Sequence, residues 1–571
     1  MNALPSPARS WWRRDVAVDI LTLTALLALA FFWWISGTPE FAANLPQDAV
    51  DFAVPAANFA GRGRLVHDLY GQEHPPAHPP GLPLMLAPAY AIFGPMLGNG
   101  IYVIQFCAAA AIVFVYGTGR RLGSRRLAIL ASLFLIFHYG FWQYSQKIMS
   151  EVPTAAMSAG LLWLLLLRDH QPLRWPVAML LGGLVGWAVW IRYDNLLLGV
   201  SLLAVVLAQR PFPPSRSWLV AMGAAALLGL TLATYQHTTF GRPWRTGYHY
   251  WGNAGRELPL LAAHNLRTTD YLKARGMPPD YAGVVEGNVH FYAVGLAAQF
   301  DTSHVFGHPA HWSGVDRPVY QSLVGIRTGL GLLGLMVALW MARRSKPMWT
   351  VAVWTLSTLA ACGLFYAFYF WQEERFFIKA VPAVAILNAV GADWLLTRAA
   401  RYGKLASAAG LVGVAVLLGG LGLYCWQQGF PSGERTYTYP ALSEASRQME
   451  SDAIVVSNFG AIRSEALLVR GTSRVGIPLN NYFPAICYPE TDNSPVRLEP
   501  FQAGAEPEKL AELARSGRPV YLVVENPWTG QPLPELAVFE RYFRVYGVAF
   551  TIAKDGRELP YLMRLKLKLP S

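Results

Sequence analysis

Carboxylates stand in a few short polar segments between long apolar runs. Asp48 and Asp51 lie three residues apart, and Glu151 begins a later apolar run. A positioned carboxylate can take a proton from a hydroxyl or an amine, so each acid is a candidate general base or a second acid that orients the reacting groups. The alternative is structural. Asp48 and Asp51 suit the first turn of a helix, and Ser150 or Glu151 suits the start of another.

Basic side chains form a second set, whose chemistry is anion binding. Arg375 and Lys379 are four residues apart, and His78 lies in the proline-rich segment 73–81. Arginine offers a fork of donors to a phosphate, and lysine offers a point charge. We therefore predict a phosphate clamp from Arg375 and Lys379, with His78 as a further contact. The alternatives are interfacial snorkelling or an Arg–Glu pair for the first two, and a solvated turn for His78.

Composition defines the kind of protein that must position these groups. The chain has 571 residues, of which 53% are hydrophobic and 14% charged. A typical soluble domain has about 25% charged residues. So few charges cannot cover the surface of a soluble protein of this size. The composition excludes an ordinary cytosolic enzyme, a disordered chain and a disulfide scaffold, and it indicates a polytopic membrane protein.

Eleven apolar stretches are predicted to cross the membrane as helices, since a bilayer forces backbone groups to pair within the segment. They are residues 20–36, 101–119, 127–146, 152–167, 175–191, 195–209, 217–236, 328–342, 349–371, 380–397 and 405–426. The segment 81–94 is shorter and contains glycine and proline, so we expect an interfacial or re-entrant helix on the outer side.

The basic residues give the orientation. With the N-terminus inside, the cytoplasmic segments carry 17 basic and four acidic residues, which accounts for the whole net charge of +12. This is the positive-inside pattern, so no nucleic-acid partner is expected. We predict a multi-pass protein of the cytoplasmic (inner) membrane, with a cytoplasmic N-terminus and an extracytoplasmic C-terminus.

The expected fold class is a polytopic α-helical membrane protein with a C-terminal extracytoplasmic α/β domain. Residues 1–429 form the transmembrane module, with outer loops 37–100 and 237–320, and residues 430–571 form the outer domain. In that domain, strands are predicted at 453–457, 519–524, 544–550 and 561–567, and helices at 463–470 and 506–517.

Polar clusters fall at the outer ends of the spans, whereas charges within the spans are almost absent. Arg192 and Asp194, between two spans, are interpreted as an internal ion pair. A transporter needs polar groups along its path through the bilayer. The distribution therefore favours a reaction at the outer face on a substrate held in the membrane.

Several motifs occur in a recognisable order. They are Asp48 with Phe52 and Ala56, then Pro79-Pro80-Gly81 and Phe93-Gly94, then Gly119-Arg120-Arg121-Leu122, Ser150-Glu151-Val152-Pro153 and Arg375-Phe376. In this order the chain resembles the C-type (GT-C) membrane glycosyltransferases, in the branch of the protein O-mannosyltransferases and lipid A aminoarabinose transferases. Ala49 and Phe52 depart from the acid and tyrosine that are common there, and Pro55 interrupts the predicted helix.

The resemblance implies an inverting hexosyl- or pentosyltransferase that uses a polyprenyl-phosphate sugar and a protein, lipid or glycan acceptor, among membrane lipids. It implies Asp48 as general base, or Asp51 if the register slips by three, with Glu151 as second carboxylate. Arg375 is the first choice for the donor phosphate, before Lys379 and His78. No cofactor or metal site is expected, with a divalent metal as the less favoured alternative. A transporter or flippase, a ligase for lipid-linked sugars, and a non-enzymatic scaffold remain the competing functions.

Overall fold

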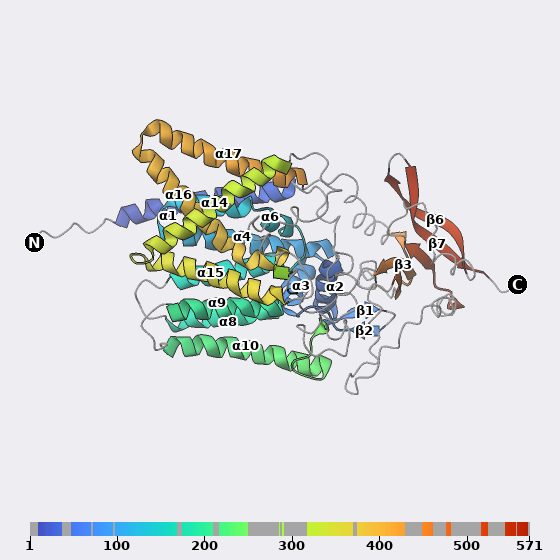
Figure 1. Ribbon diagram of the computed structural model, residues 1–571. Helices are drawn as coiled ribbons and strands as arrows, with labels where there is room; N and C mark the ends of the chain where they lie inside the picture. Colours follow the sequence, from blue (N-terminus) through green and yellow to red (C-terminus); the bar gives the residue numbers. More distant parts are fainter. Residues whose placement is uncertain are drawn as a thin grey trace, which may run out of the picture.

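The computed structural model shows a bundle of helices with a small β-sheet at one end (Figure 1). It describes residues 9–36, 47–69, 72–94, 97–167, 174–208, 216–248, 285, 288–289, 317–368, 374–428, 448–460, 475–480, 515–523, 543–554 and 557–568. The predicted helix 463–470, all but the last three residues of the predicted helix 506–517 and most of the 237–320 loop lie outside these residues, as does the predicted boundary at 429/430.

The helices follow the predicted apolar stretches in order. They are α1 (Arg9–Ser36), α2 (Gln47–Arg62), α3 (Gly81–Phe93), α4 (Ile101–Leu122), α5 (Arg125–Ile136), α6 (Tyr139–Tyr144), α7 (Glu151–Leu166), α8 (Trp175–Ile191), α9 (Leu196–Ala208), α10 (Arg216–Phe240), α14 (Arg317–Met341), α15 (Lys346–Ala367), α16 (Val381–Arg401) and α17 (Lys404–Gln428), with short 3-10 helices η1 (Leu97–Gly100), η2 (Tyr193–Asn195) and η6 (Glu374–Ala380). Among the described residues, seven helical segments are long and apolar enough to cross a membrane, and four more are apolar but shorter.

The predicted span 127–146 and the predicted outer helix 81–94 both have counterparts among these helices. The predicted span 127–146 is interrupted after α5, because the backbone of His138 is extended and its ring accepts a hydrogen bond from the Phe141 amide that starts α6. The segment 81–94 is a helix, as predicted, and most of its residues are buried in the protein. Its re-entrant position in the membrane stays a prediction.

Burial distinguishes the centre of the bundle from its edge. In the apolar stretch formed by η6 and α16, 89% of the residues are buried. The corresponding share is only 11% in α1 and 17% in α10. In Figure 1, α10 and α17 lie along opposite edges of the bundle. A helix that is apolar on every side and exposed on most of them is suited to contact with lipid. The central helix α16 packs on α14 and α5.

Glycines hold α16 against α14. A Cβ atom on Gly334 would fall 1.9 Å from the carbonyl oxygen of Leu387, and one on Gly391 would fall 2.1 Å from that of Leu330. Small residues of this kind let the backbones of membrane helices approach closely. The crossing fixes the position of α16, which begins directly after η6, the segment that carries Arg375 and Lys379.

The end of the bundle away from α2 and α3 carries exposed or half-buried ion pairs. Arg126 Nε lies 2.6 Å from Asp393 Oδ1, and Arg120 and Arg125 both contact Asp19. These contacts join α5 to α16, and α4 and α5 to α1. They use arginines of the segments predicted to face the cytoplasm.

The C-terminal strands form one mixed sheet, in the order β4-β3-β5-β7-β6. Its strands are β3 (Ile454–Gly460), β4 (Val475–Asn480), β5 (Val520–Val523), β6 (Phe543–Lys554) and β7 (Arg557–Leu567). β3 pairs in parallel with β4 and β5, and β7 pairs antiparallel with β5 and β6. The four predicted strands are confirmed, and β4 is an additional one.

A small hairpin lies between the bundle and this sheet (Figure 1). It consists of β1 (His67–Leu69) and β2 (Gln72–His74), which are paired antiparallel. β1 also contacts α2 on one side and the edge strand β4 on the other. Helix α2, the hairpin and the C-terminal sheet are therefore in contact.

Candidate active site

Helix α2 carries both aspartates of the first motif. Its residues 49–57 are buried, and the helix continues through Pro55, although proline cannot donate the intrahelical hydrogen bond to the carbonyl of Asp51. Asp48 lies in the first turn of α2, but its side chain lies outside the described residues, so its role stays a prediction. Asp51 lies one turn later and is 1% exposed.

The carboxylate of Asp51 accepts hydrogen bonds at both of its oxygens. Oδ1 accepts from His67 Nε2 at 2.6 Å and from the Ala77 amide at 3.2 Å. Oδ2 accepts from the His78 amide at 3.0 Å and from the Nδ1 of the same residue. We call Asp51, His67 and His78 the α2 cluster. It joins α2, β1 and the turn that precedes α3 around one buried acid.

These neighbours decide the ionisation of Asp51. Burial alone would raise the pKa of the carboxyl group, since it removes water from the charged form. The charge of His78 and the hydrogen bonds from His67 and His78 act in the opposite direction and outweigh burial, so the pKa of Asp51 lies below its ordinary value. Asp51 is therefore a carboxylate at neutral pH.

The proline-rich turn brings His78 to the end of α8. After Pro79 and Pro80, helix α3 starts at Gly81, whose position allows no side chain. A Cβ atom there would lie 2.4 Å from the carbonyl carbon of Trp190 and 2.8 Å from the amide nitrogen of Ile191. Glycine is required at this point for the two backbones to touch. The contact brings Gly81, three residues after His78, against the last residues of α8, which directly precede Arg192.

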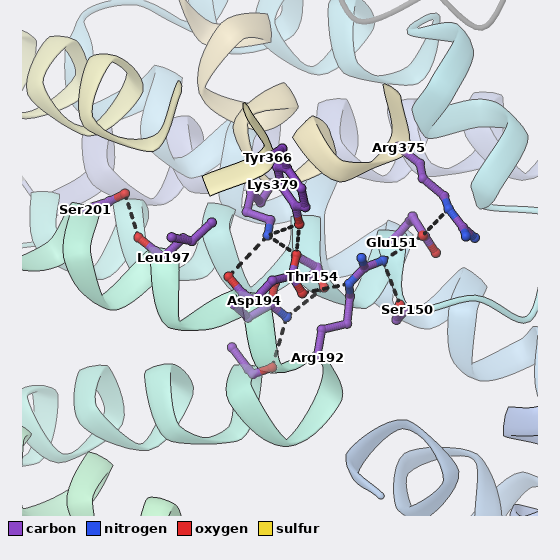
Figure 2. A network of polar contacts seen from close by, with 12 residues as sticks. Ser150, Glu151, Thr154, Arg192, Asp194, Leu197, Ser201, Tyr366, Arg375 and Lys379 are labelled. Carbon is purple, nitrogen blue, oxygen red and sulfur yellow. Dashed lines mark hydrogen bonds and ion pairs between the residues drawn. The ribbon is translucent and has the colours of Figure 1, made fainter. Parts of the chain in front are cut away.

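A second group of charges lies where α7, α8, η2, α15 and η6 meet (Figure 2). We call it the helix cluster, and it consists of Glu151, Arg192, Asp194, Tyr366, Arg375 and Lys379. Arg192 Nη1 lies 2.8 Å from Glu151 Oε1, and its Nε lies 2.9 Å from Asp194 Oδ1. The guanidinium therefore binds two carboxylates at once.

Lys379 lies on the buried side of the helix cluster. Its Nζ is 2.6 Å from Asp194 Oδ2, and the Tyr366 hydroxyl donates to the same oxygen. Lys379 is 1% exposed. In a 3-10 helix, residues three apart share a face, so Lys379 and Arg375, four apart, point in different directions. The structure directs Lys379 to Asp194.

Arg375 extends past Glu151, on the side away from Asp194 (Figure 2). Its Nε lies 3.6 Å from Glu151 Oε1, which is an ion pair beyond hydrogen-bond distance, and its side chain is 18% exposed. The guanidiniums of Arg375 and Arg192 both lie over the ring of Phe376. The contact of Arg375 with Glu151 is therefore longer than the contact of Arg192 with the same oxygen.

The charges of the helix cluster do not cancel. Arg192, Arg375 and Lys379 carry three positive charges, and Glu151 and Asp194 carry two negative ones. Glu151 is fully buried, and among the described residues no donor reaches its Oε2. An anion would be favoured by the excess cation, and a ligand hydroxyl or amine would satisfy the Glu151 oxygen.

One tyrosine links the two clusters. The ring of Tyr248 lies 5.4 Å from the ring of His78 and 6.1 Å from the ring of Tyr193, measured between centroids. Tyr193 follows Arg192 directly. Tyr248 therefore lies between His78 of the α2 cluster and Tyr193, the chain neighbour of Arg192.

Sequence reasoning found most, but not all, of these residues. It singled out Asp51, His78, Glu151, Arg375 and Lys379, and the structure brings them into these two clusters. Arg192 and Asp194 are paired, as predicted, but they also connect Glu151 to Lys379. His67, Tyr248 and Tyr366 were missed, since nothing in their spacing marks them. No group of three or more His, Cys, Asp or Glu side chains in the described part of the chain is arranged to hold a metal ion.

Comparison with known proteins adds a family match over part of the chain and a fold. Residues 77–235 match the family described as dolichyl-phosphate-mannose-protein mannosyltransferase. No curated protein sequence matches the chain. Among solved structures, ArnT from Cupriavidus metallidurans bound to undecaprenyl phosphate is similar, with a TM-score of 0.55 and 13% identity over 98% of this chain and 98% of that one.

Two structures from Archaeoglobus fulgidus are also similar. The apo oligosaccharyltransferase has a TM-score of 0.54 and 14% identity over 88% of this chain and 69% of that one. AglB in complex with an inhibitory peptide and a dolichol-phosphate has a TM-score of 0.51 and 14% identity over 96% and 74%. The chain therefore has the fold of the C-type (GT-C) membrane glycosyltransferases and carries a segment that matches the mannosyltransferase family, which confirms the resemblance predicted from its motifs.

Proposed function

We propose that this protein is an inverting glycosyltransferase that moves a monosaccharide from a polyprenyl-phosphate donor to an acceptor on the outer face of the cytoplasmic membrane. The observation that carries the proposal is the helix cluster, with its excess of positive charge beside a buried carboxylate. The fold supports it, since ArnT of this fold binds undecaprenyl phosphate.

In the proposed reaction, Arg375 is the principal contact for the donor phosphate. It is partly exposed and extends past Glu151, on the side away from Asp194. As the sugar–phosphate bond breaks, negative charge grows on the departing phosphate, and a fixed guanidinium stabilises that charge. Arg192 and Lys379 contribute to the local field, and Lys379 acts mainly by holding Asp194.

The acceptor is a weak nucleophile and needs a base, for which Asp48 is our assignment. Asp51, the alternative base, already accepts four hydrogen bonds. A carboxylate engaged in this way is poorly placed to take a further proton. Glu151 is the second carboxylate, whose Oε2 would accept a hydrogen bond from a hydroxyl or amine of the substrates.

The reaction is a single displacement. The acceptor oxygen or nitrogen attacks the anomeric carbon and gives its proton to Asp48. The bond between that carbon and the phosphate oxygen breaks, and the electron pair leaves with polyprenyl phosphate. Attack opposite the leaving group inverts the anomeric centre.

The test is release of free polyprenyl phosphate. The full-length protein in lipid nanodiscs is given polyprenyl phosphates that carry single sugars, together with a cell-envelope acceptor fraction. Release that depends on both substrates is expected, and Asp48→Asn and Arg375→Ala should each reduce it by at least about a hundredfold. Thr22→Ala, on α1 and outside both clusters, is the control, since its hydroxyl donates to the Val18 carbonyl of its own helix.

The competing functions give different results in this assay. Movement of the donor across the bilayer without cleavage of the phosphate bond would establish a flippase instead. Transfer from pyrophosphate-linked oligosaccharides alone would establish a ligase. Wild-type turnover by Asp48→Asn would overturn the assignment of the base.

A further inference from the structure

The α2 cluster has a feature that the proposed reaction does not use. One buried carboxylate holds both the main-chain amide and the ring Nδ1 of His78. The same carboxylate is anchored on its other oxygen by His67 and the Ala77 amide. Asp51 therefore fixes both the backbone and the ring orientation of His78.

Among the described residues that bind Asp51, the two histidines are the groups that can carry a compensating positive charge. Asp51 is 1% exposed, and a buried carboxylate is costly unless a positive charge or several donors compensate it. In the described part of the chain, its hydrogen-bond partners are two imidazoles and two main-chain amides, with no lysine or arginine. An ionised carboxylate beside an imidazole favours the imidazolium form.

His78 is the histidine of the pair that reaches the surface. Its side chain is 15% exposed, whereas that of His67 is fully buried. The ring of His78 packs between Phe52, at 4.4 Å, and Tyr248, at 5.4 Å. The ring of Tyr248 in turn lies 6.1 Å from the ring of Tyr193, the residue that follows Arg192.

We propose that Asp51 is a positioning residue that holds His78 as an imidazolium, so that the donor phosphate meets a positive charge that can be lost. This rests on the proposed function and adds a regulation of its donor site. Donor affinity is then high in acid, where His78 is charged, and falls as the pH rises through the range in which histidine titrates.

Other titratable groups lie near the ring of His78. His67 on β1 shares the carboxylate, and Tyr248 lies against the ring. Tyr235 of α10 lies within electrostatic reach of Asp51, and Arg192 lies beyond Tyr248. Arginine and tyrosine ordinarily keep their charge state between about pH 5.5 and 8.5, so a change in this range is assigned to a histidine.

The probe is a polyprenyl methyl phosphate. This phosphodiester keeps one negative charge across the range, whereas a phosphate monoester changes its own charge near pH 6. Its affinity for the full-length protein in nanodiscs is measured between about pH 5.5 and 8.5. The wild type should lose about tenfold in affinity across this range, because a charged contact becomes a neutral one.

Substitutions at His78 distinguish the effect of its charge on affinity from the effect of its ring. His78→Lys should bind tightly at both ends of the range, and His78→Gln weakly at both. Asp51→Asn should move the loss of affinity to lower pH. The exposed His237→Gln, on α10, is the matched control and should follow the wild type.

Two outcomes would overturn the inference. One is a wild-type affinity that does not change with pH, and the other is a His78→Lys variant that changes with pH as the wild type does. If Asp51→Asn does not fold, the two His78 variants still decide. Failure of the wild type both to bind the probe and to release polyprenyl phosphate would instead overturn the proposed function.

Discussion

The α2 cluster and the helix cluster hold different kinds of charge. The α2 cluster balances one acid with two histidines, and its members lie within 28 residues of one another, from Asp51 to His78. The helix cluster balances two acids with arginine and lysine, from segments as far apart as Glu151 and Lys379. The helix cluster therefore joins distant helices with permanent charges, whereas the α2 cluster is a local arrangement that responds to pH.

The largest effect should come from Arg192, since it binds both acids of the helix cluster. Arg192→Met leaves Glu151 without its closest cation, and loss of one partner from a buried ion pair costs about 3–5 kcal/mol. Thermal unfolding in detergent should show a much lower midpoint for Arg192→Met than for the wild type. Arg126→Met is the control, because its side chain is 42% exposed and its pair with Asp393 should contribute no more than about 1 kcal/mol. Equal losses in the two variants would contradict the difference in burial.

The second effect should depend on pH and belongs to the α2 cluster. Folding lowers the pKa of Asp51, so the ionised carboxylate stabilises the protein at pH values above its unfolded pKa of about 4. This contribution is lost as the pH falls from that value towards the pKa of the folded protein. Asp51→Asn should therefore be less stable than the wild type by about 2 kcal/mol at pH 7. The difference should shrink in acid. Unfolding midpoints measured at several pH values check this, and a constant difference would contradict it.

A third substitution tests the contact between the clusters. Gly81→Ala places a methyl group 2.4 Å from the carbonyl carbon of Trp190, so α3 must move away from α8. Overpacking of this kind costs about 1–3 kcal/mol. Transfer activity should fall further than stability, because His78 and Arg192 separate. Gly183→Ala is the matched control, since its Cβ atom meets nothing within 4 Å. Equal activity in both variants would show that the spacing is unimportant.

The smallest effect should come from Tyr248, the ring between the clusters. Tyr248 is 47% exposed, and an aromatic contact contributes about 0.5–1.5 kcal/mol. Tyr248→Ala should lower stability by about 1 kcal/mol or less and reduce transfer a few-fold. Tyr248→Phe keeps the ring and should retain activity. Reaction rates at saturating donor distinguish these variants, and an inactive Tyr248→Phe would assign a role to the hydroxyl.

Periodicity and hydropathy predicted most of the fold, because membrane helices must be apolar over their whole length. They did not predict the break at His138, which depends on one side-chain hydrogen bond. β4 was missed as well. Its residues alternate, but Pro478 within the run argues against a strand, and pairing with β3 overrides that preference.

The site was predicted as a set of residue types but not as a set of pairs. Arg375 and Lys379 appear equivalent in the sequence, yet the 3-10 geometry of η6 sends one to Glu151 and the other to Asp194. The importance of Tyr366 depends on α15 packing against η6. Spacing along the chain holds no information about such contacts between distant helices.

The glycine crossing of α14 and α16 contains none of the candidate site residues, but it fixes the helix that continues from η6. Because α16 continues directly from η6, a larger side chain at Gly391 would push α16 away from α14 and displace Arg375 with it. The packing of these two helices thus determines where the proposed contact for the donor phosphate lies. Positions there that touch no substrate should tolerate as little variation as the charged residues themselves.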